Sequence, residues 1–307
     1  MGQSLLPPQP VIYLVEPFGG SVRRQNANMP HVFWDDAAVT RGDGIFETIL
    51  IRGGRPVNLG KHLDRFRRSA GALNLPDPGG EHWITATREA VADYCRERGD
   101  AAPDTIDAAC VWTMTRGRET TGVPTAWLTV RPPNPEFARQ RKHGVSVMTT
   151  GRGFTINRDE AAVPWLALGA KTLNYAATMG ALRWARDHGY DDVIYIDPAT
   201  GRVLEGATST VLVVKRGSRL RTPAAGPDIL PGTTQQAIFE YATENGWRCK
   251  KKPLHVDDLA TAESVWLVSS VRRGVRVTAV DGTPLPAPGN EKEIAGLIDA
   301  ALAAATG

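Results

Sequence analysis

Residues 169–214 constrain the fold more than any other stretch, because a helical pattern is followed there by strand patterns without a linker. Apolar residues first recur at steps of three and four, and a glycine then predicts the helix end. The expected helix has its apolar positions at Leu173, Ala177, Ala181 and Trp184 and stops at Gly189; the expected strands cover residues 192–197, 202–205 and 211–215. The stretch therefore predicts mixed α and β structure.

Length and linker composition predict two domains. A chain of 307 residues exceeds what one hydrophobic core usually supports. The proline-rich and basic segment RPPNPEFARQRKHG is the best boundary, because such segments rarely continue a helix or strand. We expect a small N-terminal domain over residues 1–135 and a larger one over 136–307.

Composition and charge exclude several classes of protein. With 42% apolar and 22% charged residues the chain is typical of a soluble globular protein. A net charge of +3 gives no support for a nucleic-acid partner and suits small anionic molecules. The three cysteines are far apart, so neither a disulfide framework nor a metal site is expected. Without a signal-peptide pattern or a membrane-span window, a cytoplasmic protein is expected.

Further elements are read from the same periodicities. Asn58 is expected to cap a helix whose apolar positions are Leu59, Leu63, Phe66, Ala70 and Leu73. Other helices are expected over 81–98, from the Pro231 region to Gly246, and over 290–305; strands are expected over 11–15, 45–51, 107–115, 125–131 and 145–150, with a strand-like run over 263–277.

Two residues of the central stretch could take part in a reaction. Lys171 lies among the small residues Gly169, Ala170 and Thr172, so another group can approach its amine closely. It is either a solvated surface charge or a nucleophile that must first lose its proton. Glu205 ends a strand with an apolar strand behind it, and it either points into a cleft or is a half-exposed strand residue.

Anion-binding patterns occur elsewhere. Thr233 and Thr234 open a helix after a glycine, and their hydroxyls either cap the helix or help to bind an anion. Arg65 follows His62 by three residues on the 59–73 helix, so both reach one spot near the edge of the core, unless Arg65 is simply solvated. Together, an amine, an acid and an anion site match what pyridoxal phosphate requires.

The chain resembles the class IV, fold-type IV, pyridoxal-phosphate enzymes: branched-chain aminotransferases, D-amino-acid aminotransferases and aminodeoxychorismate lyases. The matching text is RGDGIFET, KHLDRF, TRG, GAKTLNY, GRVLEGATSTVLVV, LPGTT and WLVSSVRRGV, over roughly residues 39–285. The resemblance implies an α+β fold, with a small N-terminal α/β domain and a larger C-terminal domain of barrel-like sheets, and usually a homodimer.

The resemblance also implies residue roles. Lys171 would hold the pyridoxal 5'-phosphate covalently, and Glu205 would pair with its ring nitrogen. Arg65, Thr233 and Thr234 would bind the phosphate, and Ser270 would be a further contact. Candidates for the carboxylates of a small anionic amino substrate are Arg116, Arg118, Arg272 and Arg273.

Within the family, we expect 4-amino-4-deoxychorismate lyase activity, which forms 4-aminobenzoate and pyruvate for folate synthesis. The loop TRGRETTGVP lacks the Arg-x-His clamp of D-amino-acid aminotransferases, and LVSSVRRGV resembles the corresponding turn of the lyases. The Asn-Tyr pair in GAKTLNYAA and Thr210 favour the alternative, an aminotransferase for D- or branched-chain amino acids. A binding protein that keeps the fold without the cofactor is the third reading.

Overall fold

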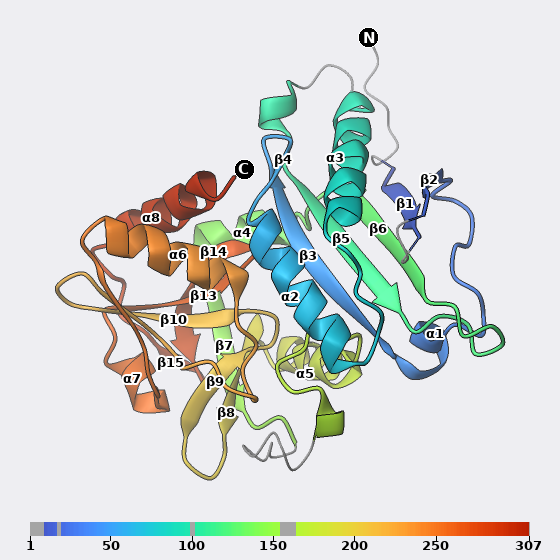
Figure 1. Cartoon of the computed structure of the whole chain (residues 1–307). Helices are drawn as coiled ribbons and strands as arrows, with labels where there is room; N and C mark the ends of the chain where they lie inside the picture. Colours follow the sequence, from blue (N-terminus) through green and yellow to red (C-terminus); the bar gives the residue numbers. More distant parts are fainter. Residues whose placement is uncertain (1–8, 17–19, 99–101, 154–163, 307) are drawn as a thin grey trace. The chain divides into compact units, whose positions relative to one another are not determined.

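The chain forms two compact units in the structure, a computed structural model that describes residues 9–16, 20–98, 102–153 and 164–306 (Figure 1). Unit 1 comprises Met1–Pro133, Ala170–Asn174 and Thr306–Gly307, and unit 2 comprises Asn134–Gly169 and Tyr175–Ala305. The short segment with Lys171 thus belongs to unit 1 although its flanks belong to unit 2. The predicted boundary after residue 135 stays a prediction.

Unit 1 is built on a six-stranded antiparallel sheet with the order β2-β1-β6-β5-β3-β4. The strands are β1 (Val11–Val15), β2 (Val22–Gln25), β3 (Gly44–Arg52), β4 (Arg55–Pro56), β5 (Ala108–Thr115) and β6 (Thr125–Arg131); the helices are α1 (Ala37–Arg41), α2 (Leu59–Ala72) and α3 (Glu81–Arg96), with a 3-10 turn at Pro103–Thr105. The predicted strands and the two long helices of this region are confirmed.

The core of unit 1 lies between its sheet and the apolar faces of α2 and α3. Phe66, Trp83 and Trp112 are fully buried, and the ring centroid of Phe66 lies 4.9 Å from that of Trp83 and 5.6 Å from that of Trp112. The Trp112 indole N–H donates a 2.8 Å hydrogen bond to Thr87 Oγ1, so the polar group of this buried ring is satisfied. A rigid core therefore supports β3 and α2.

The predicted cap at Asn58 is wrong. Asn58 does precede α2, but its side chain makes no capping hydrogen bond and its φ is 58°. A capping side chain needs an extended backbone to reach the first-turn amides, whereas Asn58 has the left-handed conformation that asparagine tolerates.

Unit 2 contains a mixed nine-stranded sheet. Its main path runs β12-β11-β10-β13-β14-β7-β8-β9, and β15 pairs with β14. The strands are β7 (Val145–Thr150), β8 (Asp192–Asp197), β9 (Arg202–Gly206), β10 (Thr210–Lys215), β11 (Arg219–Thr222), β12 (Arg248–Lys251), β13 (Ser264–Ser269), β14 (Arg273–Val280) and β15 (Thr283–Pro284). Register shifts in β14/β7 and β8/β9 bend the sheet, as bulges do. The α+β fold class is confirmed.

One helix of unit 2 lies in the segment that was expected to be a linker. The helices of this unit are α4 (Glu136–His143), α5 (Ala176–Asp187), α6 (Thr233–Glu244), α7 (Val256–Ala260) and α8 (Glu291–Ala304), with a 3-10 turn at Pro164–Leu166. Helix α4 lies inside the segment expected to be a linker. The expected strand-like run 263–277 is a hairpin of β13 and β14. Among the described residues, no helix is long and apolar enough to cross a membrane.

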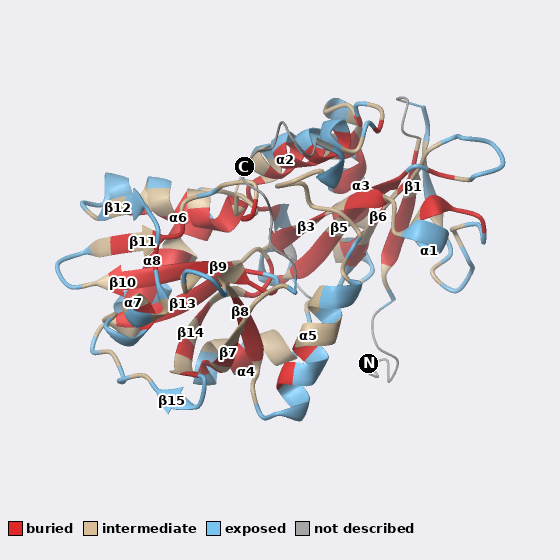
Figure 2. Cartoon of the chain, turned by 90° about the horizontal axis from the view of Figure 1, so that it is seen from below, coloured by how far each residue is buried: buried red, intermediate tan, exposed pale blue. Residues whose placement is uncertain are grey.

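Of the predicted apolar positions of α5, Ala181 packs against an apolar cluster, whereas Ala177 and Trp184 are exposed. The helix begins after Leu173, and its buried residues are Leu182 and Ala185. Trp184, expected in the core, is 53% exposed and stacks on His188. Leu182 and Ala185 lie in one apolar cluster with Val193 of β8. The face of α5 that packs on the sheet is therefore rotated from the one expected (Figure 2).

Candidate active site

In unit 1, the main chain around Lys171 is attached to β3 and α2. Phe46 N donates to Lys171 O at 3.1 Å, and Lys171 N donates to Ser69 Oγ at 3.0 Å. The Lys171 ammonium nitrogen lies 4.3 Å from the centroid of the Phe46 ring, within the range of a cation–π contact. A Cβ at Gly44 would lie 2.8 Å from Met114 O as well as from Leu173 Cδ1, so the main chain leaves no room for a side chain there. The main chain of Lys171 is therefore fixed by hydrogen bonds at both its N–H and its C=O group.

A buried ionic cluster lies in the same unit. Glu47 is 0% exposed and accepts hydrogen bonds from His62 Nδ1 at 2.7 Å and from Arg65 Nε and Nη2 at 2.6 and 2.7 Å. The spot that His62 and Arg65 were predicted to share is this carboxylate. Buried charges occur where they are paired in this way.

Protonation follows from these contacts. Burial alone would raise the pKa of Glu47, but the charge and hydrogen bonds of Arg65, and then those of His62, lower the pKa to about 2. Burial, with the nearby positive charges of Arg65 and Lys171, lowers the pKa of His62 below its usual value, although the charge and hydrogen bond of Glu47 raise it. His62 is then a neutral ring whose Nδ1–H donates to Glu47, which leaves its Nε2 as an acceptor.

In unit 2, Glu205 is held by an arginine that the sequence did not single out. Glu205 Oε1 is hydrogen-bonded to Arg152 Nη2, and Glu205 Oε2 accepts from Leu230 N at 3.1 Å. Arg152 Nη1 also donates to Asp228 O at 2.6 Å. The side chains of Arg152 and Glu205 are 14% and 20% exposed, so their charges interact with little screening by solvent.

Helix α6 begins three residues after Leu230, whose N–H bonds Glu205, and its start has the features of an anion site. Gly232 is the N-cap and no side chain caps the helix, while Thr233 and Thr234 are each 3% exposed. A Cβ at Gly232 would lie 2.4 Å from Thr210 Oγ1. Ser209 Oγ and Gln235 Nε2 are buried and, within the described part of the chain, have no hydrogen-bond partner. Helix-start amides and spare donors fit a phosphate group.

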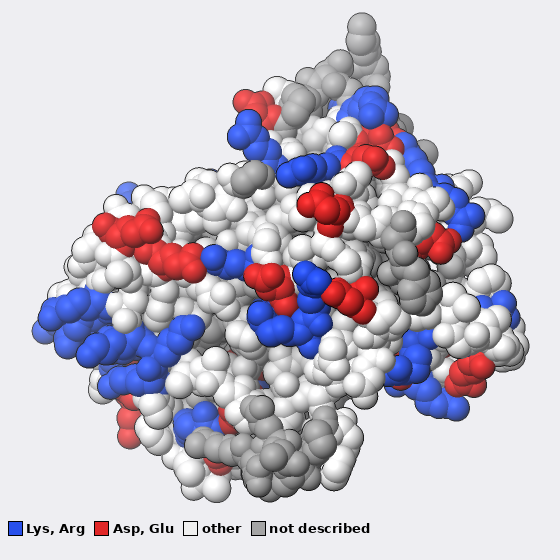
Figure 3. Space-filling view, viewed as in Figure 1, with Lys and Arg blue, Asp and Glu red and all other residues white. Residues whose placement is uncertain are grey.

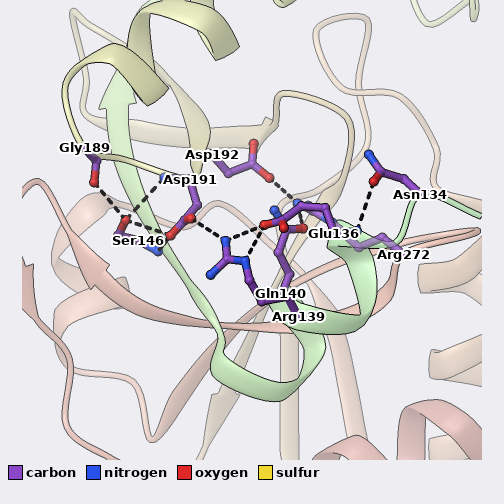
Figure 4. A network of polar contacts seen from close by, with 9 residues as sticks. All are labelled: Asn134, Glu136, Arg139, Gln140, Ser146, Gly189, Asp191, Asp192 and Arg272. Atoms are coloured by element: carbon purple, nitrogen blue, oxygen red, sulfur yellow. Dashed lines mark hydrogen bonds and ion pairs between the residues drawn. The ribbon is translucent and has the colours of Figure 1, made fainter.

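Ser270 and the four arginines proposed for substrate contact occupy different environments. Ser270 lies half-buried in the turn after β13. Arg272 is 6% exposed and donates to Asp192 Oδ2 at 2.5 Å, in a polar network shown in Figure 4. Arg273 Nη1 lies 3.6 Å from Asp299 Oδ1.

The other two arginines belong to unit 1 and are more accessible. Arg116 Nε bonds Asp43 Oδ2 at 2.6 Å, and its side chain is 44% exposed. Arg118 Nε bonds Asp35 Oδ1 at 2.9 Å, its side chain is 30% exposed, and its guanidinium lies 4.1 Å from the Phe33 ring centroid.

The sequence analysis did not single out two residues of these clusters, Glu47 and Arg152. Only Glu47 has a sequence pattern that could have identified it. Glu47 is a carboxylate inside the apolar strand IFETILI, where burial requires partners, and the HLDR segment supplies them. Arg152 follows β7 in an irregular loop, among many arginines, and nothing in its local sequence distinguishes it.

Each unit, taken by itself, carries groups that one class of enzyme uses. Unit 1 has a lysine whose main chain is fixed and a buried arginine; unit 2 has a carboxylate paired with an arginine and a helix start with unpaired donors nearby. An amine for an aldehyde, an acid for a ring nitrogen and donors for a phosphate are what a pyridoxal-phosphate enzyme needs.

Comparison with known proteins supplies the family. The model of the amino-transferase class IV family matches residues 44–280, so the chain belongs to this family. It is 39% identical over 280 residues to a Mycobacterium tuberculosis protein named bifunctional aminodeoxychorismate lyase / D-amino acid transaminase, covering 89% of this chain and 94% of that protein.

Solved structures agree. A putative aminotransferase from Corynebacterium glutamicum is 47% identical with a TM-score of 0.75, covering 96% of this chain and 99% of that chain. The PLP-bound form of a hypothetical aminotransferase from Mycobacterium tuberculosis is 37% identical with a TM-score of 0.86 and the same coverage. The predicted family, fold type and enzyme class are confirmed, and the PLP-bound relative agrees with the predicted cofactor.

Proposed function

We propose that this enzyme is a pyridoxal-phosphate-dependent 4-amino-4-deoxychorismate lyase that forms 4-aminobenzoate and pyruvate, a step of folate synthesis. The observation that carries the proposal is the similarity, over nearly the whole chain, to a relative whose name includes this lyase activity. The paired carboxylate Glu205 and the backbone-held Lys171 support it, since both lyase and transaminase chemistry need them.

The residues have separate tasks in this proposal. Lys171 Nζ would hold the cofactor, and its free amine would take a proton at Nζ from the carbon beside the substrate nitrogen. Glu205, paired with Arg152, would accept a hydrogen bond from the ring nitrogen. Arg65, Thr233, Thr234, Ser270 and the amides that start α6 hold the phosphate. When bound, pyridoxal phosphate supplies the electron sink that makes this proton acidic.

Substrate carboxylates need cations that a solute can reach. Arg116 and Arg118 meet this condition best, because their side chains are 44% and 30% exposed. Arg272 is 6% exposed and already paired with Asp192, and Arg273 is 15% exposed. We propose that Arg116 and Arg118 bind the substrate carboxylates. Arg272 and Arg273, which follow Ser270 in the chain, would instead support the turn that carries Ser270.

The test is product identification. Purified holoenzyme incubated with 4-amino-4-deoxychorismate should release 4-aminobenzoate, detected by its fluorescence after chromatography. Lys171→Ala should abolish release and the borohydride-stable link to the cofactor, whereas the exposed lysine variant Lys142→Ala should keep both. Holoenzyme that exchanges amino groups readily but yields no aminobenzoate would refute the lyase proposal.

An aminotransferase is the second candidate, because the same relative is also named a D-amino acid transaminase. Incubation with D-alanine and 2-oxoglutarate, and separately with L-leucine, followed by chiral amino-acid chromatography, separates the two substrate classes. Exchange with D-alanine together with release of 4-aminobenzoate would indicate both activities, as in the name of the relative. Exchange with L-leucine alone would favour a branched-chain enzyme. A homodimer, expected from the family resemblance, is tested by light scattering of the holoenzyme.

A further inference from the structure

Basic side chains gather at the open end of the unit 2 sheet. Residues 215–221 and 248–252 form or flank β11 and β12, and Figure 3 shows a broad basic area on the side of unit 2 that carries α7 and the β10–β11 turn. The basic residues of these two stretches are Lys215, Arg216, Arg219, Arg221, Arg248, Lys250, Lys251 and Lys252. The proposed chemistry of the active site uses none of them.

Strand register places four of these cations on one face. Strands β11 and β12 are parallel, with Arg219 opposite Arg248 and Arg221 opposite Lys250. Residues two apart along a strand point to the same side, so the four side chains form a two-by-two array. Leu220, which points to the other side, is fully buried. The array therefore faces away from the core.

Within the described part of the chain, no acidic side chain pairs with this array. Its arginines donate to main-chain carbonyls: Arg219 Nε to Arg216 O at 2.7 Å, and Arg248 Nη2 to Gly217 O at 3.4 Å. Over the described ranges of the chain, no carboxylate oxygen forms an ion pair with any of the four. Like charges directly opposite each other destabilise a sheet, so this arrangement has a cost that an anionic partner would remove.

The outer side of β12 is also open. It is the terminal strand of the sheet, and Arg248 N and Lys252 N donate inward to Ser218 O and Thr222 O at 2.9 and 3.0 Å. In a parallel ladder alternate residues face the neighbour, so the N–H and C=O groups of Cys249 and Lys251 face outward. An open edge is a template for one more strand.

We propose that this edge binds an acidic, extended segment of a partner protein, which adds as a strand beside β12. Main-chain groups of the segment would pair with those of Cys249 and Lys251. Acidic side chains two residues apart would then lie beside Arg248 and Lys250, at the distance of a cross-strand pair.

The geometry disfavours two other occupants. A second copy of this chain would place the positive charges of Arg248 and Lys250 beside the same charges of the other copy. Repulsion of this kind keeps edge strands from pairing with each other. The array extends only about 7 Å along the strand, two residues of rise, which matches few phosphates of a nucleic acid. Duplex binding usually rests on several phosphate contacts.

The experiment measures fluorescence anisotropy of two labelled peptides with the holoenzyme. TVEVDVT has its acids two apart and thus on one face, whereas its isomer TVVEDVT has them adjacent and on opposite faces. We expect the first to bind at least about tenfold more tightly, because only it can pair both acids with the array. Equal affinity of the isomers would overturn the proposal.

Variants separate charge from strand addition. Arg248→Glu/Lys250→Glu, or the milder Gln pair if the first misfolds, should weaken TVEVDVT binding at least about tenfold. Lys142→Glu/Lys292→Glu makes the same change in net charge at exposed positions outside β11 and β12 and should alter binding less than about threefold. Lys251→Pro removes one outward N–H and should weaken binding about fivefold.

Two results count against strand addition. Binding that responds to charge reversal but is unchanged in Lys251→Pro would show a simple electrostatic contact. A labelled 20-base-pair DNA duplex that binds more tightly than TVEVDVT at 0.15 M salt, and loses affinity in Arg248→Glu/Lys250→Glu, would assign the surface to nucleic acid instead.

Discussion

Replacing Glu47 by glutamine tests the buried ionic cluster of unit 1. The carboxylate is fully buried and accepts three hydrogen bonds from His62 and Arg65. Glutamine keeps the shape but removes the negative charge that faces Arg65, whose side chain is 6% exposed. Breaking one side of a buried pair typically destabilises a protein by about 3–5 kcal/mol.

The same magnitude follows from proton linkage. Lowering the pKa of Glu47 from 4.5 to about 2 corresponds to about 3 kcal/mol of stabilisation of the charged form, at ~1.4 kcal/mol for each tenfold change in proton affinity. We therefore expect Glu47→Gln to lose about 3 kcal/mol of unfolding free energy. Urea unfolding followed by tryptophan fluorescence measures it, since Trp83 and Trp112 are buried in the same unit.

A matched control exists on the surface of α2. Arg67 and Asp77 form a bidentate pair like that of Arg65 and Glu47, but their side chains are 48% and 58% exposed. Asp77→Asn should leave the urea midpoint unchanged, because exposed pairs are screened by water and salt. If Glu47→Gln unfolded at the wild-type midpoint, the buried cluster would not stabilise unit 1 and its proposed support of Arg65 would fail.

Three further outcomes are expected. Stability at acid pH should fall in two steps. Below about pH 6.5 the unfolded state binds a proton on His62 that the folded state resists, so the urea midpoint of His62→Gln should change less between pH 7 and 5 than that of the wild type. The contribution of Glu47 is complete above about pH 4.5 and disappears as the pH falls toward about 2. Arg152→Met should reduce turnover about tenfold or more and Glu205→Gln about a hundredfold, with unchanged far-UV circular dichroism; near-normal rates would remove both from the ring-nitrogen task. Gly232→Ala should weaken cofactor binding about tenfold in a pyridoxal-phosphate titration, because its Cβ would meet Thr210 Oγ1 at 2.4 Å, whereas Gly246→Ala at the far end of α6 should not.

Local pattern predicted the elements that have a clear apolar pattern. The strand over residues 45–51 is an apolar run, and the α2 face with Leu63, Phe66 and Ala70 recurs at helical spacing; both contribute to the same core. Helix α5 was readable as a helix but not in its orientation. Its alanine-rich sequence offers several weakly apolar faces, and only the packing of Leu182 and Ala185 beside Val193 selects one.

The sequence by itself determined which chemistry this chain carries: an amine at Lys171, an acid at Glu205, and a hydroxyl-rich helix start at Thr233, within a family text that covers most of the chain. Tertiary structure alone decided which groups support them. Glu47 and Arg152 lie 18 and 53 residues from the side chains they pair with, Arg65 and Glu205. Such contacts depend on how strands and helices distant in sequence fold together, and no local periodicity records them.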